Sequence, residues 1–151
     1  MSKESVQLGF KNGELVNVYQ ALQGYKLKGR ASLGRTWLGK RLADANKQFN
    51  EDRTATQKVY FKTDDDGEFV YQADKKTLIL KDDYTMDEAQ SNFDQLINEV
   101  INIDVSQYSE RMKALYQSLA DYPYELDGQT AEVYAVLFDE LEKAFGKGEQ
   151  Q

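Results

Sequence analysis

Most of the hydrophobic residues in this chain recur at helical spacing. The pattern predicts a first helix between Glu14 and Gly24 and a longer second helix from about Ala31 to about Lys58. The apolar stripe of the second helix consists of Leu38, Leu42, Ala45 and Phe49, with Trp37 beside it. The pattern fades beyond residue 50, so we expect an exposed second half. Together the two segments predict an N-terminal helical hairpin.

Three further helices are predicted in the second half of the chain. Thr85-Met-Asp-Glu88 has the spacing of a capping box and predicts that a helix begins there. Another helix is expected from Ser106 to the residues before Pro123, because a proline disfavours helical geometry in the residue that precedes it. The last helix is expected to begin at Asp127 or at Gln129–Thr130 and to end at Gly146, which leaves residues 146–151 as a tail.

Period-two alternation marks a few short extended segments. Val6, Leu8 and Phe10 alternate with polar residues, and so does the stretch 101–105. Residues 59–81 hold three aromatic or β-branched runs separated by polar turns, which predicts a small β-hairpin or three-stranded patch. A helical continuation through the first of these runs is the alternative. We therefore predict a single, mainly α domain over 1–151, with a helical hairpin, further helices and a small β patch near 59–81.

The composition removes several classes of chemistry. The 151 residues include no cysteine and no histidine. Disulfides, thiolate zinc sites, cysteine nucleophiles and Ser-His-Asp triads are therefore excluded. The N-terminus lacks the apolar core of a signal peptide, and no apolar run approaches the roughly 20 residues that cross a bilayer. We expect a cytosolic protein that does not enter a membrane.

Charge is distributed unevenly along the chain. Residues 1–53 carry ten Lys/Arg against five Asp/Glu, whereas residues 54–151 carry nine against twenty-one, and the whole chain has a net charge of −7. Between Glu14 and Asp44 there is no acidic residue. Such a two-signed molecule favours docking or self-association in a fixed orientation. The predicted binding residues are the cations of this stretch and two neighbouring aromatic residues: Tyr25, Lys26, Lys28, Arg30, Arg35, Trp37, Lys40 and Arg41.

Other site patterns give weaker predictions. The basic residues could contact nucleic acid, but the net acidity of the chain weakens long-range attraction to a polyanion. The acidic loops, among them Asp64–Asp66, could mimic DNA, although acids are ordinary in turns and at helix starts. Asp64-Asp-Asp-Gly67 fails as an EF-hand, because the first ligand position would be Lys62 and the last would be Ala73. The glycines at 24, 29, 34 and 39 match neither phosphate-binding motif. We predict no catalytic residues, no metal site and no cofactor.

The chain resembles a known family over most of its length. The resemblance lies in the opening FKNGELVNVYQALQGYKLKGRASLGRTWLGKRLADANKQFNED, in DDGEFVY and in YAVLFDELE near the end. These segments are similar to small uncharacterised proteins of Gram-positive tailed phages and prophages, the phage domain of unknown function 1617. The resemblance implies a setting near tail and lysis genes. It supplies no activity and no catalytic residues.

These observations together predict a non-enzymatic phage or prophage accessory protein. It is expected to act by protein–protein contact or self-association, with particle (tail) assembly as the setting, in the cytoplasm of the bacterial host or in the virion. One alternative is an acidic inhibitor of a host nucleic-acid-binding defence enzyme. The other is a nucleic-acid-binding accessory that uses the basic N-terminal cluster.

Overall fold

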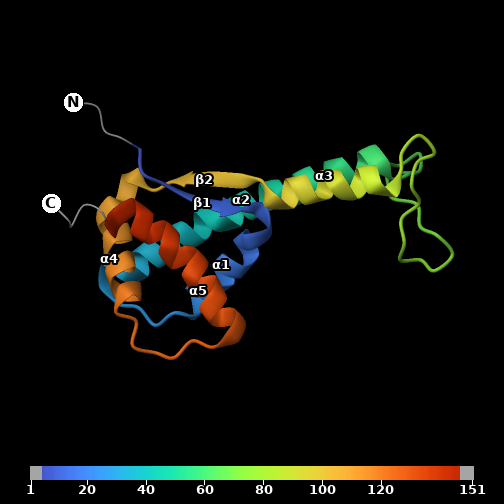
Figure 1. Ribbon diagram of the computed structural model, residues 1–151. Helices are drawn as coiled ribbons and strands as arrows, with labels where there is room; N and C mark the ends of the chain where they lie inside the picture. Colours follow the sequence, from blue (N-terminus) through green and yellow to red (C-terminus); the bar gives the residue numbers. More distant parts are fainter. Residues whose placement is uncertain (1–4, 147–151) are drawn as a thin grey trace. The chain divides into compact units, whose positions relative to one another are not determined.

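The computed structural model describes residues 5–146 and divides them into two compact units (Figure 1). The first unit combines the two ends of the chain, residues 5–46 and 100–146, and the second unit is formed by residues 47–99. Helices predominate and a small antiparallel sheet accompanies them, which confirms the mainly α prediction. None of the helices among the described residues is long and apolar enough to span a bilayer.

The sheet of the first unit joins segments that are far apart in the sequence. Strand β1 (Gln7–Lys11) pairs antiparallel with β2 (Val100–Asp104), with Leu8 opposite Ile103. Both segments were predicted to be extended from their alternating pattern. Their pairing was not predicted, and the two-stranded sheet does not lie at the expected place near 59–81. It contributes Leu8, Phe10 and Ile103 to the core.

Several helices accompany this sheet in the first unit. In chain order they are η1 (Asn12–Glu14), α1 (Leu15–Gly24), the beginning of α2 (Gly29–Tyr60), η2 (Ser106–Tyr108), α4 (Ser109–Ala120), α5 (Gly128–Leu141) and the π-helical turn η3 (Glu142–Gly146). The four α-helices present leucines to a common core, among them the fully buried Leu22, Leu38, Leu115 and Leu137. Leu38 and Leu42, from the apolar stripe predicted for α2, therefore face inward. Of the predicted tail, Gly146 ends η3, and residues 147–151 lie outside the described residues.

Two glycines of α2 lie where other helices approach closely. A Cβ atom on Gly34 would stand 2.7 Å from the carbonyl oxygen of Arg111 in α4. A Cβ atom on Gly39 would stand 3.1 Å from Nε2 of Gln23 in α1. Only a residue without a side chain permits the first of these approaches, so Gly34 sets the distance between α2 and α4.

The second unit contains the remainder of α2, an irregular segment and α3 (Met86–Asn98). Thr85 caps α3 as predicted, because its hydroxyl accepts a hydrogen bond from the Glu88 amide at 3.2 Å. Between the helices, three isolated antiparallel bridges join Phe61 to Leu80, Thr63 to Phe69 and Tyr71 to Leu78. The predicted β patch is thus reduced to bridges, and it begins after residue 60 because α2 continues through Val59 and Tyr60.

Aromatic rings form the centre of the second unit. The ring of Tyr60 meets that of Tyr84 edge to face, with centroids 4.9 Å apart. The rings of Phe61 and Phe93 are stacked at 6.3 Å. Phe61 is buried, while the two bridge partners Tyr71 and Leu78 are more exposed. This unit therefore relies on a few ring contacts rather than on a broad aliphatic core.

Candidate docking face

The solvent side of α2 in the first unit carries four of the eight predicted binding residues. At 100° per residue, five positions fall within an arc of about 100°. They are Arg30, Leu33, Trp37, Lys40 and Arg41, and we call this set the docking face. Leu33 is 50% exposed and all three cations are exposed. The buried stripe of Ala31, Leu38 and Leu42 lies on the opposite side of the helix.

Aromatic rings and guanidinium groups alternate across this surface. The guanidinium of Arg41 lies over the ring of Trp37, 5.1 Å from its centroid. Trp37 in turn meets Tyr108 edge to face at 5.4 Å, and Arg111 lies over the ring of Tyr108 at 3.9 Å. These contacts hold two cations in fixed positions while leaving their charges uncompensated. Tyr108 and Arg111 were not among the predicted residues, since they reach Trp37 only through the tertiary fold.

The cations of the docking face are not paired with carboxylates. Across residues 5–146, no ion pair involves Arg30, Lys40 or Arg41, nor Lys26 or Lys28 in the segment that precedes α2. Lys26 instead lies over the ring of Tyr124, 4.7 Å from its centroid, and its backbone amide donates to the Tyr122 hydroxyl. This positive charge is thus available to a partner.

Arg35 has an internal role in the structure. It is half-buried, and its guanidinium donates to the carbonyl oxygen of Tyr25 at 2.6 Å and to Oγ of Ser32 at 3.2 Å. These bonds tie the segment before α2 to the helix itself. Arg35 therefore positions the chain on which Lys26 and Lys28 stand, and its side chain points away from the arc of the docking face.

Tyr25 is also directed inward. Its side chain is only 4% exposed and meets the rings of Tyr122 and Tyr134 edge to face. Its hydroxyl has no hydrogen-bond partner among the described residues. Burial, together with the two neighbouring tyrosines, raises the pKa of Tyr25 to about 12, so the hydroxyl keeps its proton at neutral pH. Tyr25 is thus a core residue of the first unit.

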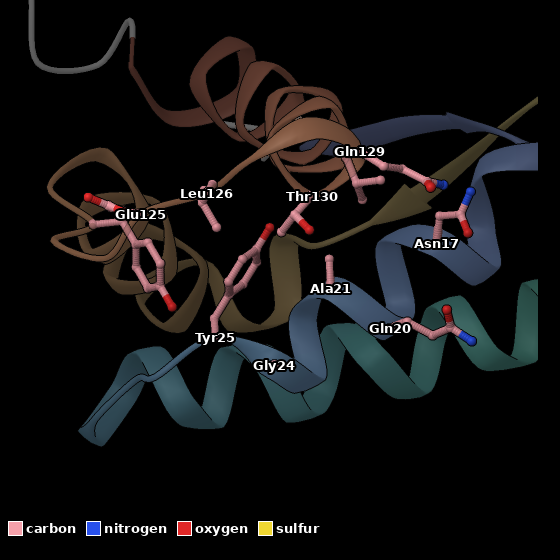
Figure 2. Close-up of a pocket in the computed structure, with 11 residues that line it drawn as sticks. Asn17, Gln20, Ala21, Gly24, Tyr25, Glu125, Leu126, Gln129 and Thr130 are labelled. Carbon is pink, nitrogen blue, oxygen red and sulfur yellow. The ribbon is translucent and has the colours of Figure 1, made fainter.

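A shallow depression of about 510 Å³ lies beside Tyr25, between α1 and the start of α5 (Figure 2). Three carboxamides border it, from Asn17 and Gln20 on α1 and from Gln129 on α5. Carboxamides both donate and accept hydrogen bonds, and Glu125 adds a carboxylate, so this surface suits polar groups that form hydrogen bonds. This depression could not be predicted from the sequence, because its residues are scattered over positions 17–133 and share no motif.

A second depression, of about 490 Å³, borders the docking face itself. Trp37 and Arg41 line one side, and Asn102 and Asp104 of β2 line the other. The Asp104 carboxylate accepts a hydrogen bond from the Ser106 amide at 2.8 Å, and this bonding holds the pKa of Asp104 below its usual range. Asp104 therefore stays ionised, with its Oδ1 committed to the turn after β2. The depression joins α2 to an edge of the sheet.

The acidic turn of the second unit is held by hydrogen bonds between one of its side chains and its own backbone amides. The Asp64 carboxylate accepts from the amides of Asp66 and Glu68, at 2.9 and 3.0 Å. In the described part of the chain, no group of three or more acidic side chains is arranged to hold a metal ion. The turn that was predicted at 63–67 is therefore formed by Asp64 as an Asx-type cap.

The protein is mainly helical. In its first unit a two-stranded sheet packs with helices, and α2 presents a basic and aromatic surface. A comparison with protein families shows that the chain belongs to the family described as protein of unknown function (DUF1617), whose model matches residues 6–149. This match confirms the resemblance to the domain of unknown function 1617. No curated protein and no solved structure matches the chain significantly.

Proposed function

We propose that this chain is a non-catalytic phage or prophage accessory protein that binds an acidic partner protein during particle (tail) assembly. The observation that supports the proposal is the docking face, where three exposed cations surround Trp37 and no carboxylate of residues 5–146 pairs with them. Charges of one sign around an aromatic residue are typical of a protein interface, where the aromatic residue packs and the charges select a partner of opposite charge.

The contacts that Trp37 already makes favour a protein partner over nucleic acid. Trp37 already has Arg41 over its ring and the edge contact with Tyr108, so less of the indole is available for stacking on a base. The net charge of −7 also opposes long-range attraction to a polyanion. An acidic patch on a protein carries less charge than a nucleic acid and meets less repulsion from the rest of this chain.

The acidic-inhibitor function remains a second candidate because of the second unit. Residues 47–99 carry seven Lys/Arg against thirteen Asp/Glu, a net charge of −6, and Asp64, Asp65 and Asp66 are all exposed. That surface suits a basic partner, such as a nucleic-acid-binding enzyme of the host. The two proposals use different units, so charge reversals separate them.

The decisive experiment is affinity capture of the tagged protein from its producing cell, with nuclease treatment and mass spectrometry. The wild-type chain is compared with a double variant, Lys40→Glu with Arg41→Glu, and with a matched control, Lys75→Glu with Lys76→Glu. Lys75 and Lys76 are exposed residues of the second unit, and no ion pair of the described residues involves them. Both variants change the net charge by the same amount. Circular dichroism checks that each variant is folded.

The assembly proposal predicts that phage structural proteins co-purify with the wild-type chain and with the control, survive nuclease and are lost with the docking-face variant. Equal recovery with all three chains would refute the docking face as the contact surface. Retention of a host nuclease or polymerase that is lost on charge reversal of Asp64–Asp66 would establish the inhibitor function instead. Loss of every captured protein after nuclease would indicate contact through nucleic acid.

A further inference from the structure

The hydrogen bonds around the sheet reveal which edges are free. In an antiparallel pair, residues alternate between those that bond their partner strand and those that point away from it. The Val105 amide donates to the Val6 carbonyl, so Ile103 and Ile101 also point toward β1. The amides of Asn102 and Asp104 therefore point outward, away from β1.

The same alternation applies to β1, and its outer edge is satisfied. The Gly9 amide donates to the Glu140 carboxylate of α5 at 2.7 Å, and the Lys11 amide donates to Glu14 at 2.9 Å. Both carboxylates block addition of a further strand at that edge. On β2, by contrast, neither outward amide donates a hydrogen bond to a group of residues 5–146. The two edges of one small sheet are thus treated differently.

The free edge of β2 borders the depression beside the docking face. Asn102 and Asp104 form one wall of this depression, and Trp37 and Arg41 form the other. An extended segment that entered it would meet backbone donors and acceptors on one side, and an indole ring and a guanidinium on the other. Arg41 and its exposed neighbour Lys40 outweigh the single carboxylate of Asp104 beside this depression, and they favour carboxylate side chains on that segment.

We propose that β2 accepts an extended, acidic segment of the partner protein as a third strand of the sheet. Backbone hydrogen bonds to Asn102 and Asp104 supply the pairing, as in other cases of strand addition, and Lys40 and Arg41 select for carboxylates. The inference rests on the proposed function and specifies its partner: an extended stretch of about five residues, which matches the length of β2.

The test uses two substitutions at one outward position. Asn102→Pro removes the outward amide but no bond to β1, and proline is tolerated on edge strands. Asn102→Ala keeps the amide and removes only the side chain. The probe is a library of random nine-residue peptides displayed on their own messenger RNA and selected on the full-length wild-type protein. Affinities of the selected peptides are then measured by isothermal titration calorimetry for wild type, for both variants and for Lys40→Glu with Arg41→Glu. Thermal melting confirms folding.

Strand addition predicts that the selected peptides are acidic. Their affinity should fall about tenfold for Asn102→Pro and for the Lys40/Arg41 variant, and it should change less than about twofold for Asn102→Ala. In the wild-type complex, the Asn102 and Asp104 amides become protected from hydrogen exchange. If Asn102→Pro binds like wild type while the charge variant does not, strand addition is wrong and the docking face still stands. If neither variant changes the affinity, or no peptide is selected, both proposals fail at this surface. A concentration-dependent dimer that Asn102→Pro abolishes would overturn the inference in favour of a second copy on this edge.

Discussion

At the scale of single residues, similar sequence surroundings conceal opposite roles. Tyr25 and Arg35 stand in the same basic stretch as Lys40 and Arg41, and all four were predicted to bind. In the fold, Arg35 donates to the carbonyl of a buried Tyr25, while Lys40 and Arg41 are exposed. The direction of a side chain thus separates residues that position the surface from residues that can contact a partner.

The raised pKa of Tyr25 makes the stability of the protein depend on alkaline pH. The unfolded chain loses this proton near pH 10 and the folded chain near pH 12. The folded state therefore has its full advantage below pH 10 and loses it as the pH rises to 12, a change of about 2–3 kcal/mol in the free energy of unfolding. Urea denaturation at several pH values should show this decline, and Tyr25→Phe should show a decline that is smaller by that amount. Equal declines would mean that Tyr25 ionises normally.

Glu140 offers a second residue-scale prediction. Its side chain is 19% exposed and accepts from the Gly9 amide, which ties α5 to β1. Glu140→Ala should lower the free energy of unfolding by about 1–3 kcal/mol, because it leaves a partly buried amide without an acceptor. Glu140→Gln keeps an acceptor oxygen and serves as the control, with a smaller loss. Chemical denaturation measures both, and an alanine variant as stable as wild type would contradict the role of this bond.

At the scale of elements, α2 serves two purposes in the first unit. One side of the helix is buried through Leu38 and Leu42, and the other presents the docking face. Gly34 lets α4 approach the helix, and α4 carries Arg111, which packs on Tyr108 and so supports Trp37. The packing of two helices therefore contributes to the arrangement of the surface rings.

This close approach predicts a large effect for a small substitution. Gly34→Ala places a methyl group 2.7 Å from a backbone oxygen of α4, and we expect a loss of about 1–3 kcal/mol in the free energy of unfolding. Gly24→Ala is the matched control, since a Cβ atom there meets nothing within 4 Å. In thermal denaturation, the melting temperature of Gly34→Ala should be lower than that of the wild type, and that of Gly24→Ala should be close to it. Equal melting temperatures for the two variants would show that α2 and α4 can move apart without loss of stability.

At the scale of the whole molecule, the two units differ in charge. The second unit has a net charge of −6, whereas residues 1–46 with 100–151 carry twelve Lys/Arg against thirteen Asp/Glu, a net charge of −1. Within the first unit the cations of the N-terminal stretch are concentrated on and just before α2. A partner thus meets a local positive surface on a chain that is acidic as a whole.

This distribution predicts a negative result with nucleic acid. A fluorescently labelled 20-base-pair DNA should show no saturable binding by anisotropy at protein concentrations up to about 100 µM in 150 mM salt, the range in which non-specific DNA-binding proteins bind. The matching RNA should behave in the same way. Binding that weakens steeply with added salt, and that is lost when Lys26, Lys28 and Arg30 are neutralised, would contradict the protein-contact proposal and support the nucleic-acid accessory.

The local elements could be predicted from the order of the amino acids, because helical periodicity and caps act over a few residues. The sequence predicted α1, most of α2, the Thr85 cap of α3 and the two extended segments that became β1 and β2. The pairing of these two segments across about ninety residues became evident only in the three-dimensional fold, since it depends on which faces the helices leave free. The same holds for the candidate site. The sequence identified the basic stretch, but the fold decided that Tyr25 is buried, that Tyr108 and Arg111 support Trp37, and that a free strand edge lies beside Arg41.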